Sequence, residues 1–183
     1  DGVFLSISAT TNCGFDLYEQ SLIGYSNNYF IQVPVMIQIV LGAIGYPVLI
    51  EIKEYFSKKN KRFKFSLFTK VTVTMYSILF VLGAFMYTLL EWNGNSAGES
   101  AFSKIMNGVF MSISARSGGI VVEDPSTLNE VTQMILSMLM FIGSSPSSAG
   151  GGIRTTTLLI IIMTVYAFSK GRKHVSMFKR RIA

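Results

Sequence analysis

Charged residues are scarce in this sequence of 183 residues: Asp, Glu, Lys and Arg make up 14% of it, whereas 50% of it is hydrophobic. A soluble domain usually carries about a quarter charged residues. There is one cysteine, Cys13, and one histidine, His174. A single cysteine excludes an internal disulfide and a CxxC metal site, and a single histidine excludes a His-based metal or catalytic cluster. The composition therefore points away from disulfide-bonded domains and His-dependent enzymes, and toward a membrane protein.

Long hydrophobic runs stand where a soluble protein would carry charge. Residues 30–50 and 71–90 contain no charged side chain. Each run is about 20 residues long, which is the length an α-helix needs to cross the ~30 Å hydrocarbon core of a bilayer. We therefore predict that each run is a membrane-spanning helix and that the protein is an all-α, multi-pass protein of the cell membrane.

Lys and Arg are absent from residues 1–52 and gather in residues 53–70 and 170–183. A net charge of +6 is compatible with nucleic-acid binding, but basic residues that flank hydrophobic runs are typical of the cytoplasmic ends of membrane spans. We therefore expect both clusters to be cytoplasmic and expect no nucleic-acid partner. The clusters serve topology and lipid headgroups, or they dock a cytosolic partner as well.

An internal repeat divides the chain. Residues 2–9 read GVFLSISA and residues 108–115 read GVFMSISA, a spacing of 106 residues. Downstream, Gly14 aligns with Gly119 at a spacing of 105 residues. Such self-similarity predicts duplicated units. Residues 101–115 are too few to span the membrane, so we predict a re-entrant pore helix that returns through a glycine-containing loop. Non-helical backbone at membrane depth suits a filter of carbonyl oxygens that replace the water around an ion; the alternative is a glycine turn that packs two helices.

A third apolar segment, residues 131–169, is interrupted by GSSPSSAGGG at 143–152. The segment is about twice as long as one membrane crossing requires. Because the tail that follows it is expected to be cytoplasmic, the segment makes only one net crossing. We therefore predict one broken transmembrane helix whose loop lies in the permeation path; a Pro/Gly kink between packed helices is the alternative. Arg154, a cation at membrane depth, either places positive charge near the pore or anchors loop carbonyls. Arg116 is expected to support the second glycine loop by hydrogen bonds, with contact to ions as the alternative, and Asn12 is expected to brace the first loop.

Three motifs resemble the Ktr/Trk/HKT superfamily of potassium transporters, and the Ktr type most closely. SATTNCGFD (8–16) and SARSGGI (114–120) resemble its second and third pore loops, and GSSPSSAGGGIRTTT (143–157) resembles its third-repeat signature. The resemblance implies potassium uptake across the cell membrane, either passive or coupled to sodium. K⁺ is then the transported ion, and no cofactor is covalently bound. A sodium-permeable transporter of the same superfamily is the alternative. The resemblance also implies that the chain is a fragment or a partial copy of a four-unit subunit.

The resemblance carries over to individual residues. It implies an ion-binding filter formed by Asn12, Cys13, Gly14, Ser117, Gly118 and Gly119. It implies a gate formed by Gly143, Ser144, Ser145, Pro146, Ser147, Ser148, Ala149, Gly150, Gly151, Gly152 and Arg154. It further implies a homodimer that sits on a cytosolic nucleotide-binding ring of the RCK type.

The expected organisation follows from the repeat. Residues 1–56 are expected to close the second pore repeat, with a pore helix, a filter and a transmembrane helix. Residues 57–70 form a cytoplasmic basic loop, residues 71–169 form the third pore repeat, and residues 170–183 form a cytoplasmic basic tail. The filter loops then face the outside of the cell.

Two other function classes explain the sequence less well. An intramembrane serine protease with its nucleophile in residues 143–152 needs a base at membrane depth, but the single histidine is in the tail and the predicted spans contain no aspartate. A non-conducting assembly module leaves two filter-like loops unexplained. We therefore expect a transporter rather than an enzyme.

Overall fold

The computed structural model describes residues 1–18, 20–57, 65–92, 94, 100–171, 176–177 and 180–181. Most of the basic loop and of the basic tail that the sequence predicts lies outside the described residues. The elements are α1 (Gly2–Thr11), η1 (Ile23–Tyr25), α2 (Tyr29–Ile44), α3 (Tyr46–Ser57), α4 (Leu67–Leu90), α5 (Ala101–Ile113), η2 (Ser114–Gly118), η3 (Pro125–Thr127), α6 (Glu130–Phe141), α7 (Thr155–Ser169), β1 (Ser176–Met177) and β2 (Arg180–Arg181). Apart from the short antiparallel pair β1–β2, every described element is helical. The predicted all-α class is confirmed.

Helix α4 matches the predicted span 71–90 and extends it toward the N-terminus. The hydroxyl of Ser66 accepts a hydrogen bond from the amide of Thr69 at 3.2 Å, which caps the helix and moves its start to Leu67. Among the described helices, α4 alone is long and apolar enough to cross a membrane unbent.

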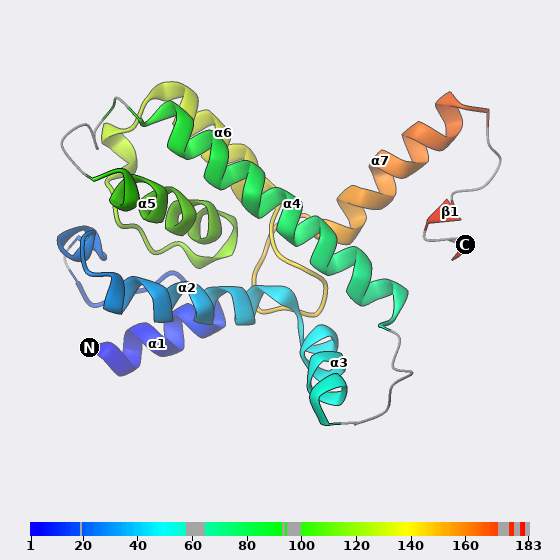
Figure 1. Ribbon diagram of the computed structural model, residues 1–183, viewed down its shortest axis with the longest axis horizontal. Coiled ribbons are helices and arrows are strands. Elements are labelled where there is room, and N and C mark those ends of the chain that lie inside the picture. Colours follow the sequence, from blue (N-terminus) through cyan, green and yellow to red (C-terminus); the bar gives the residue numbers. More distant parts are fainter. Residues whose placement is uncertain are drawn as a thin grey trace.

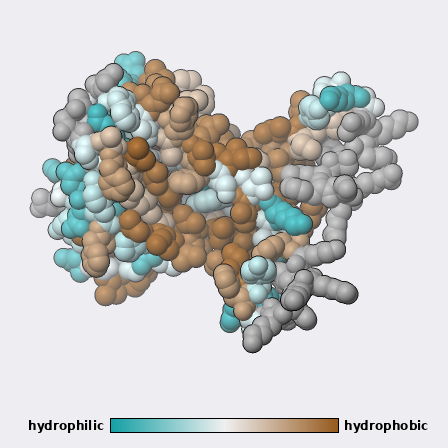
Figure 2. All heavy atoms as spheres, in the orientation of Figure 1, coloured by the Kyte–Doolittle hydropathy of each residue, from teal (hydrophilic) through white to brown (hydrophobic). Residues whose placement is uncertain are grey.

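The two faces of α4 differ in their surroundings. Thr72, Tyr76 and Gly83 lie on the buried face, whereas Val81 and Phe85 on the opposite face are 61% and 60% exposed. Brown, hydrophobic atoms accordingly cover much of the middle of the molecule's surface in Figure 2. An exposed face of this composition is expected of a helix that packs on protein on one side and on lipid on the other.

The predicted span over residues 30–50 is a bent pair of helices rather than a single helix. Helix α2 ends at Ile44, α3 begins at Tyr46, and the two are bent by 106°. Gly45 between them has φ +94°, a conformation that side chains rarely adopt. Hydropathy could not reveal the bend, because the uncharged run of residues 30–50 continues through Gly45.

The two repeats form two facing pairs of helices. Helix α1 lies along α2, α5 lies beside α4, and α2 contacts α5 between the pairs (Figure 1). Small residues permit the close packing of α5 on α4, since a Cβ at Gly108 would lie 2.3 Å from the Oγ1 of Thr88 and one at Gly83 would lie 2.4 Å from the Oγ of Ser112. The predicted pore helix 101–115 is thus α5, which continues into the π-helical turn η2.

The third apolar segment is broken, as predicted, into α6 and α7 with non-helical chain between them. Glu91 fixes the start of α6 against the end of α4. Its carboxylate is 3% exposed and accepts hydrogen bonds from the amide of Asn129 at 2.9 Å and the hydroxyl of Thr132 at 2.8 Å. A carboxylate at this end of α6 also interacts favourably with the helix dipole.

Arg116 is buried in a way that the sequence did not predict. Its side chain is 3% exposed, and none of its three side-chain nitrogens has a hydrogen-bond partner among the described residues. The expected hydrogen bonds to the glycine loop are therefore wrong. Instead, the guanidinium carbon lies 3.9 Å from the centre of the Tyr76 ring. This cation–π contact joins η2 to α4, and contacts of this kind are worth about 0.5–2 kcal/mol.

The contact predicts a difference between two substitutions of Tyr76. Tyr76→Phe keeps the aromatic face and should change the thermal stability of the detergent-solubilised protein little. Tyr76→Leu removes the face and should destabilise the protein by about 1–2 kcal/mol more than Tyr76→Phe does. Because leucine also leaves a cavity, the same pair should be measured in an Arg116→Met background. If the difference between the two substitutions persists unchanged there, the cation–π contact does not stabilise the fold.

Candidate ion filter and gate

The two glycine loops, which are far apart in the sequence, lie against each other. Gly14 has φ +74° and Gly119 has φ +72°, so the two aligned glycines share one left-handed conformation. A Cβ at Gly119 would lie 3.0 Å from the Cα of Gly14, and a Cβ at Gly14 would lie 3.1 Å from the carbonyl oxygen of Gly118. Backbone torsion and close approach thus both require glycine at these positions.

A polar contact links the residues that precede these glycines. Ser117 aligns with Asn12 at the same offset, and its hydroxyl donates to the Oδ1 of Asn12 at 3.2 Å. The side-chain amide of Asn12 donates in turn to the carbonyl of Ile39 at 3.4 Å. Asn12 therefore braces the first loop, as expected, and it also connects that loop to the second loop and to α2.

Both helix ends carry an amide-to-carbonyl bond that spans five residues, although Asn12 is left-handed at the end of α1 and Ser114–Gly118 form the π-helical turn η2. The amide of Cys13 donates to the carbonyl of Ser8 at 3.1 Å, and the amide of Gly119 donates to the carbonyl of Ser114 at 3.0 Å. Each loop therefore begins at the C-terminal, negative end of a short helix, where a helix dipole favours a nearby cation. The six candidate filter residues are brought together by these contacts, with Cys13 exposed at the loop surface and Gly118 buried against Ile39.

The extended segment that follows Gly119 (residues 120–123) is held at its far end by Glu123. The carboxylate accepts from the hydroxyl of Tyr87 at 2.7 Å and from the side-chain amide of Asn107 at 2.9 Å, which ties the segment to α4 and to α5. The sequence does not single out Glu123. Nothing in its local pattern indicates the contact, because both partners lie on other helices.

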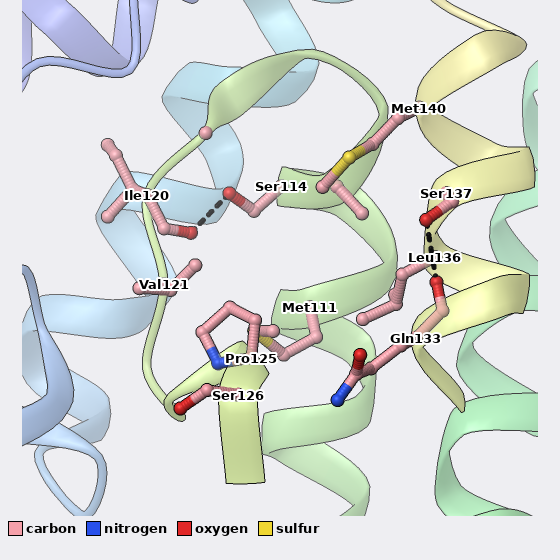
Figure 3. Close-up of a pocket in the computed structure, with 12 residues that line it drawn as sticks. Met111, Ser114, Ile120, Val121, Pro125, Ser126, Gln133, Leu136, Ser137 and Met140 are labelled. Carbon is pink, nitrogen blue, oxygen red and sulfur yellow. Dashed lines mark hydrogen bonds between the residues drawn. The ribbon is translucent and has the colours of Figure 1, made fainter. Parts of the chain in front are cut away.

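A pocket of about 280 Å³ lies between this segment, α5 and α6 (Figure 3). Its lining is mostly apolar, with the hydroxyl of Ser114 directed across it at the carbonyl of Ile120. The residues that line it are Met111, Ser114, Ala115, Gly119, Ile120, Val121, Pro125, Ser126, Gln133, Leu136, Ser137 and Met140.

The loop between α6 and α7 has a closed neck. The amide of Ser144 donates to the carbonyl of Gly151 at 3.0 Å, and a Cβ at Gly152, which has φ +82°, would lie 2.6 Å from the Cα of Gly143. The two ends of the loop therefore touch, and residues 145–150 project from them. A simple kink between two packed helices needs no such projection.

The projecting part of the loop sits on the corner between α2 and α3. The amides of Ser145 and Ala149 donate to the carbonyls of Ala43 and Gly42 at 3.1 and 3.2 Å, and the amide of Tyr46 donates to the carbonyl of Ser147 at 3.1 Å. Gly45 is required at this corner, since a Cβ there would lie 2.6 Å from the carbonyl oxygen of Pro146. Gly42 also packs against α1, since a Cβ there would meet the carbonyl oxygen of Thr10.

The loop also touches the second glycine loop. A Cβ at Gly150 would lie 2.8 Å from the Cβ of Ser117. The candidate gate and the candidate filter are therefore neighbours in space, although Ser117 and Gly150 lie on opposite sides of α6 in the sequence.

Arg154 binds the loop from its C-terminal side. Its Nη1 lies 2.7 Å from the carbonyl oxygen of Gly150, 3.2 Å from that of Ser145 and 3.5 Å from the Oγ of Ser148. Of the two roles considered for this cation, these contacts correspond to the anchor. A second set of bonds, from Ser148 to Ser144 and Ser145, ties the loop to itself.

Comparison with known proteins places this arrangement in a family. The chain is 44% identical over 181 residues to "Ktr system potassium uptake protein D" of Bacillus subtilis, which covers 99% of the chain and 40% of that protein. It is 29% identical over 181 residues to "Potassium/sodium uptake protein NtpJ" of Enterococcus hirae, which covers 98% of the chain and 39% of that protein. The chain thus spans about two fifths of the length of these relatives.

The fold is similar to that in the crystal structure of the potassium transporter TrkH from Vibrio parahaemolyticus. The TM-score is 0.76 at 16% sequence identity, over 96% of this chain and 37% of that one. The model of the TrkH family, described as "Cation transport protein", matches residues 1–183. The chain therefore belongs to the TrkH family of cation transport proteins.

Proposed function

We propose that the chain forms the second and third units of a pore through which potassium enters the cell. The observation that carries the proposal is the juxtaposition of Gly14 and Gly119, in one conformation, at the ends of two duplicated helices. Loops of this kind present backbone carbonyls in place of the hydration water of an ion. The names of the relatives from Bacillus subtilis and Enterococcus hirae, which are potassium and potassium/sodium uptake proteins, agree with this activity.

The filter in this proposal consists of Asn12, Cys13, Gly14, Ser117, Gly118 and Gly119. The bond from Ser117 to Asn12 holds the two loops in register, and the left-handed glycines set the direction of the neighbouring carbonyls. Sodium is the second candidate ion, because one relative is named for both ions. Competition between rubidium and sodium in transport distinguishes the two.

The filter predicts that Gly119→Ser, made in the full-length protein, lowers rubidium affinity or selectivity over sodium by about tenfold, because a side chain at φ +72° is strained and meets Gly14. Uptake is measured in cells that lack their own potassium uptake and is normalised to membrane-inserted protein. The matched control is Gly24→Ser, since a Cβ at Gly24 meets nothing within 4 Å. Equal affinity and selectivity in both variants would contradict the filter assignment.

We propose that the gate consists of residues 143–152 and Arg154. Three features support this: the neck is closed, the projecting part contacts Ser117, and its seat on α2 and α3 consists of hydrogen bonds to a different element rather than of helix packing. In this proposal Arg154 holds the loop in its obstructing conformation by binding the carbonyls of Ser145 and Gly150. The small side chains leave room for an ion when the loop moves.

The closed neck makes a deletion possible that leaves α6 and α7 in place. Replacing residues 145–150 by two glycines should raise rubidium flux per inserted molecule, with little change in affinity, because it removes the obstruction and spares the filter. Arg154→Gln should raise flux to a smaller extent, since it loosens the loop without removing it. Lower flux than wild type at normal abundance in the deletion variant would refute the gate.

The remaining proposals concern the whole protein. We propose a multi-pass protein of the cell membrane with the filter loops outside and the segments 57–70 and 170–183 in the cytoplasm, assembled as a homodimer on an RCK-type ring. Transport is passive or coupled to sodium. The naming of one relative as part of a Ktr system supports a multi-component assembly. The organisation into residues 1–56, 57–70, 71–169 and 170–183 shifts slightly, because α3 extends to Ser57 and α4 begins at Leu67.

The ring predicts a role for the basic tail. Neutralising the five tail residues at 172, 173, 179, 180 and 181 should weaken co-purification of the ring in detergent, because cytoplasmic positive charge then no longer faces the ring. Membrane insertion should be unaffected, since basic residues remain in 53–70. If the same amount of ring is recovered, the tail does not bind it.

A further inference from the structure

The segment that follows the candidate filter glycine Gly119 is tied to the end of α5 by one serine. The hydroxyl of Ser114 donates to the carbonyl of Ile120, and the carbonyl of Ser114 accepts from the amide of Gly119 at 3.0 Å (Figure 3). Ser114 is 2% exposed and Ile120 is fully buried. The candidate filter residue Gly119 therefore lies between two bonds to the same serine.

The side-chain bond determines which way one peptide group faces. A carbonyl that accepts from Ser114 points back at the end of α5, so it does not point into the space that Gly119 shares with Gly14. Without the hydroxyl, this buried carbonyl has lost its partner, and a buried acceptor without a partner is costly. Rotation of the peptide would relieve that cost and would change the set of carbonyls available to an ion.

The duplicated loop has no such bond. Ser8 occupies the position of Ser114 in the repeat, and its carbonyl likewise accepts from the amide of Cys13 at 3.1 Å. The hydroxyl of Ser8, however, is buried with no hydrogen-bond partner in the part of the chain that the structure describes. The residue after the glycine differs as well, since Phe15 is 70% exposed where Ile120 is buried. The same serine position thus ties one loop to its helix through the side chain, and in the other loop it makes no such bond.

We propose that Ser114 is a positioning residue for ion selection: its hydroxyl orients the Ile120 carbonyl and thereby fixes the peptide groups around Gly119, whereas Ser8 has no such role. The inference rests on the proposed filter function. It makes the third-repeat loop the rigid member of the pair and the second-repeat loop the adaptable one.

The repeat supplies a matched pair of variants. Ser114→Ala and Ser8→Ala remove the same atom from equivalent positions of the full-length protein. Ser114→Ala should reduce discrimination between rubidium and sodium by about three- to tenfold, which corresponds to the loss of one buried hydrogen bond. Ser8→Ala should stay close to wild type. Discrimination is measured as inhibition of rubidium uptake by sodium, together with the KM and maximal rate, all normalised to membrane-inserted protein.

The outcomes separate the inference from the function on which it rests. If the wild-type protein mediates no rubidium uptake above background, the proposed function fails. If the wild type transports and both alanine variants discriminate equally, the role of Ser114 is refuted while the function stands. Should Ser114→Ala not insert, Ser114→Cys replaces it, because a thiol of similar size is a weaker donor. Intermediate discrimination in Ser114→Cys supports the role, and wild-type discrimination overturns it.

Discussion

Backbone hydrogen bonds between the 143–152 loop and the corner of α2 and α3 connect the two repeats of this chain. The loop lies between α6 and α7, in the third repeat, whereas Gly42, Ala43 and Tyr46 lie in the second repeat. Non-helical backbone has no partners of its own, and within a membrane no water is available to replace them. The bend at Gly45 exposes the end carbonyls of α2, and the loop uses them. The break in one repeat is thus stabilised by the bend in the other.

The glycines serve the same arrangement at several points. Gly45 admits the carbonyl of Pro146, Gly14 and Gly119 admit each other, and Gly150 approaches Ser117. Each contact brings backbone against backbone or against a small side chain at a distance that a Cβ would obstruct. The result is a compact layer in which the two glycine loops, the 143–152 loop and the α2–α3 corner share partners, so movement of the 143–152 loop would change the surroundings of Ser117.

The duplicated segments show that equal local sequence does not ensure equal support. GVFLSISA lies wholly within the α-helix α1, whereas GVFMSISA passes from α5 into the π-helical turn η2. The third-repeat loop is additionally held through Ser114, through Glu123 and through the stacking of Arg116 on Tyr76. Those partners come from α4, from α5 or from the loop's own segment 120–123. The second-repeat loop packs against α2 instead. Divergence of the two loops therefore lies in what surrounds them.

The sequence by itself determined the helical class, the family, the short helix at 101–115 and the break at 143–152, because hydrophobic length, repetition and clusters of glycine, serine and proline are local properties of the chain. It also predicted the equivalence of Gly14 and Gly119, which share one backbone conformation. Tertiary structure alone decided the 106° bend in 30–50, the seat of the loop on α2 and α3, and the partners of Arg116 and Arg154. The bend and these partners could not be deduced from local patterns, because a backbone torsion at one glycine leaves hydropathy unchanged and a buried polar group takes whichever partner the distant chain brings to it.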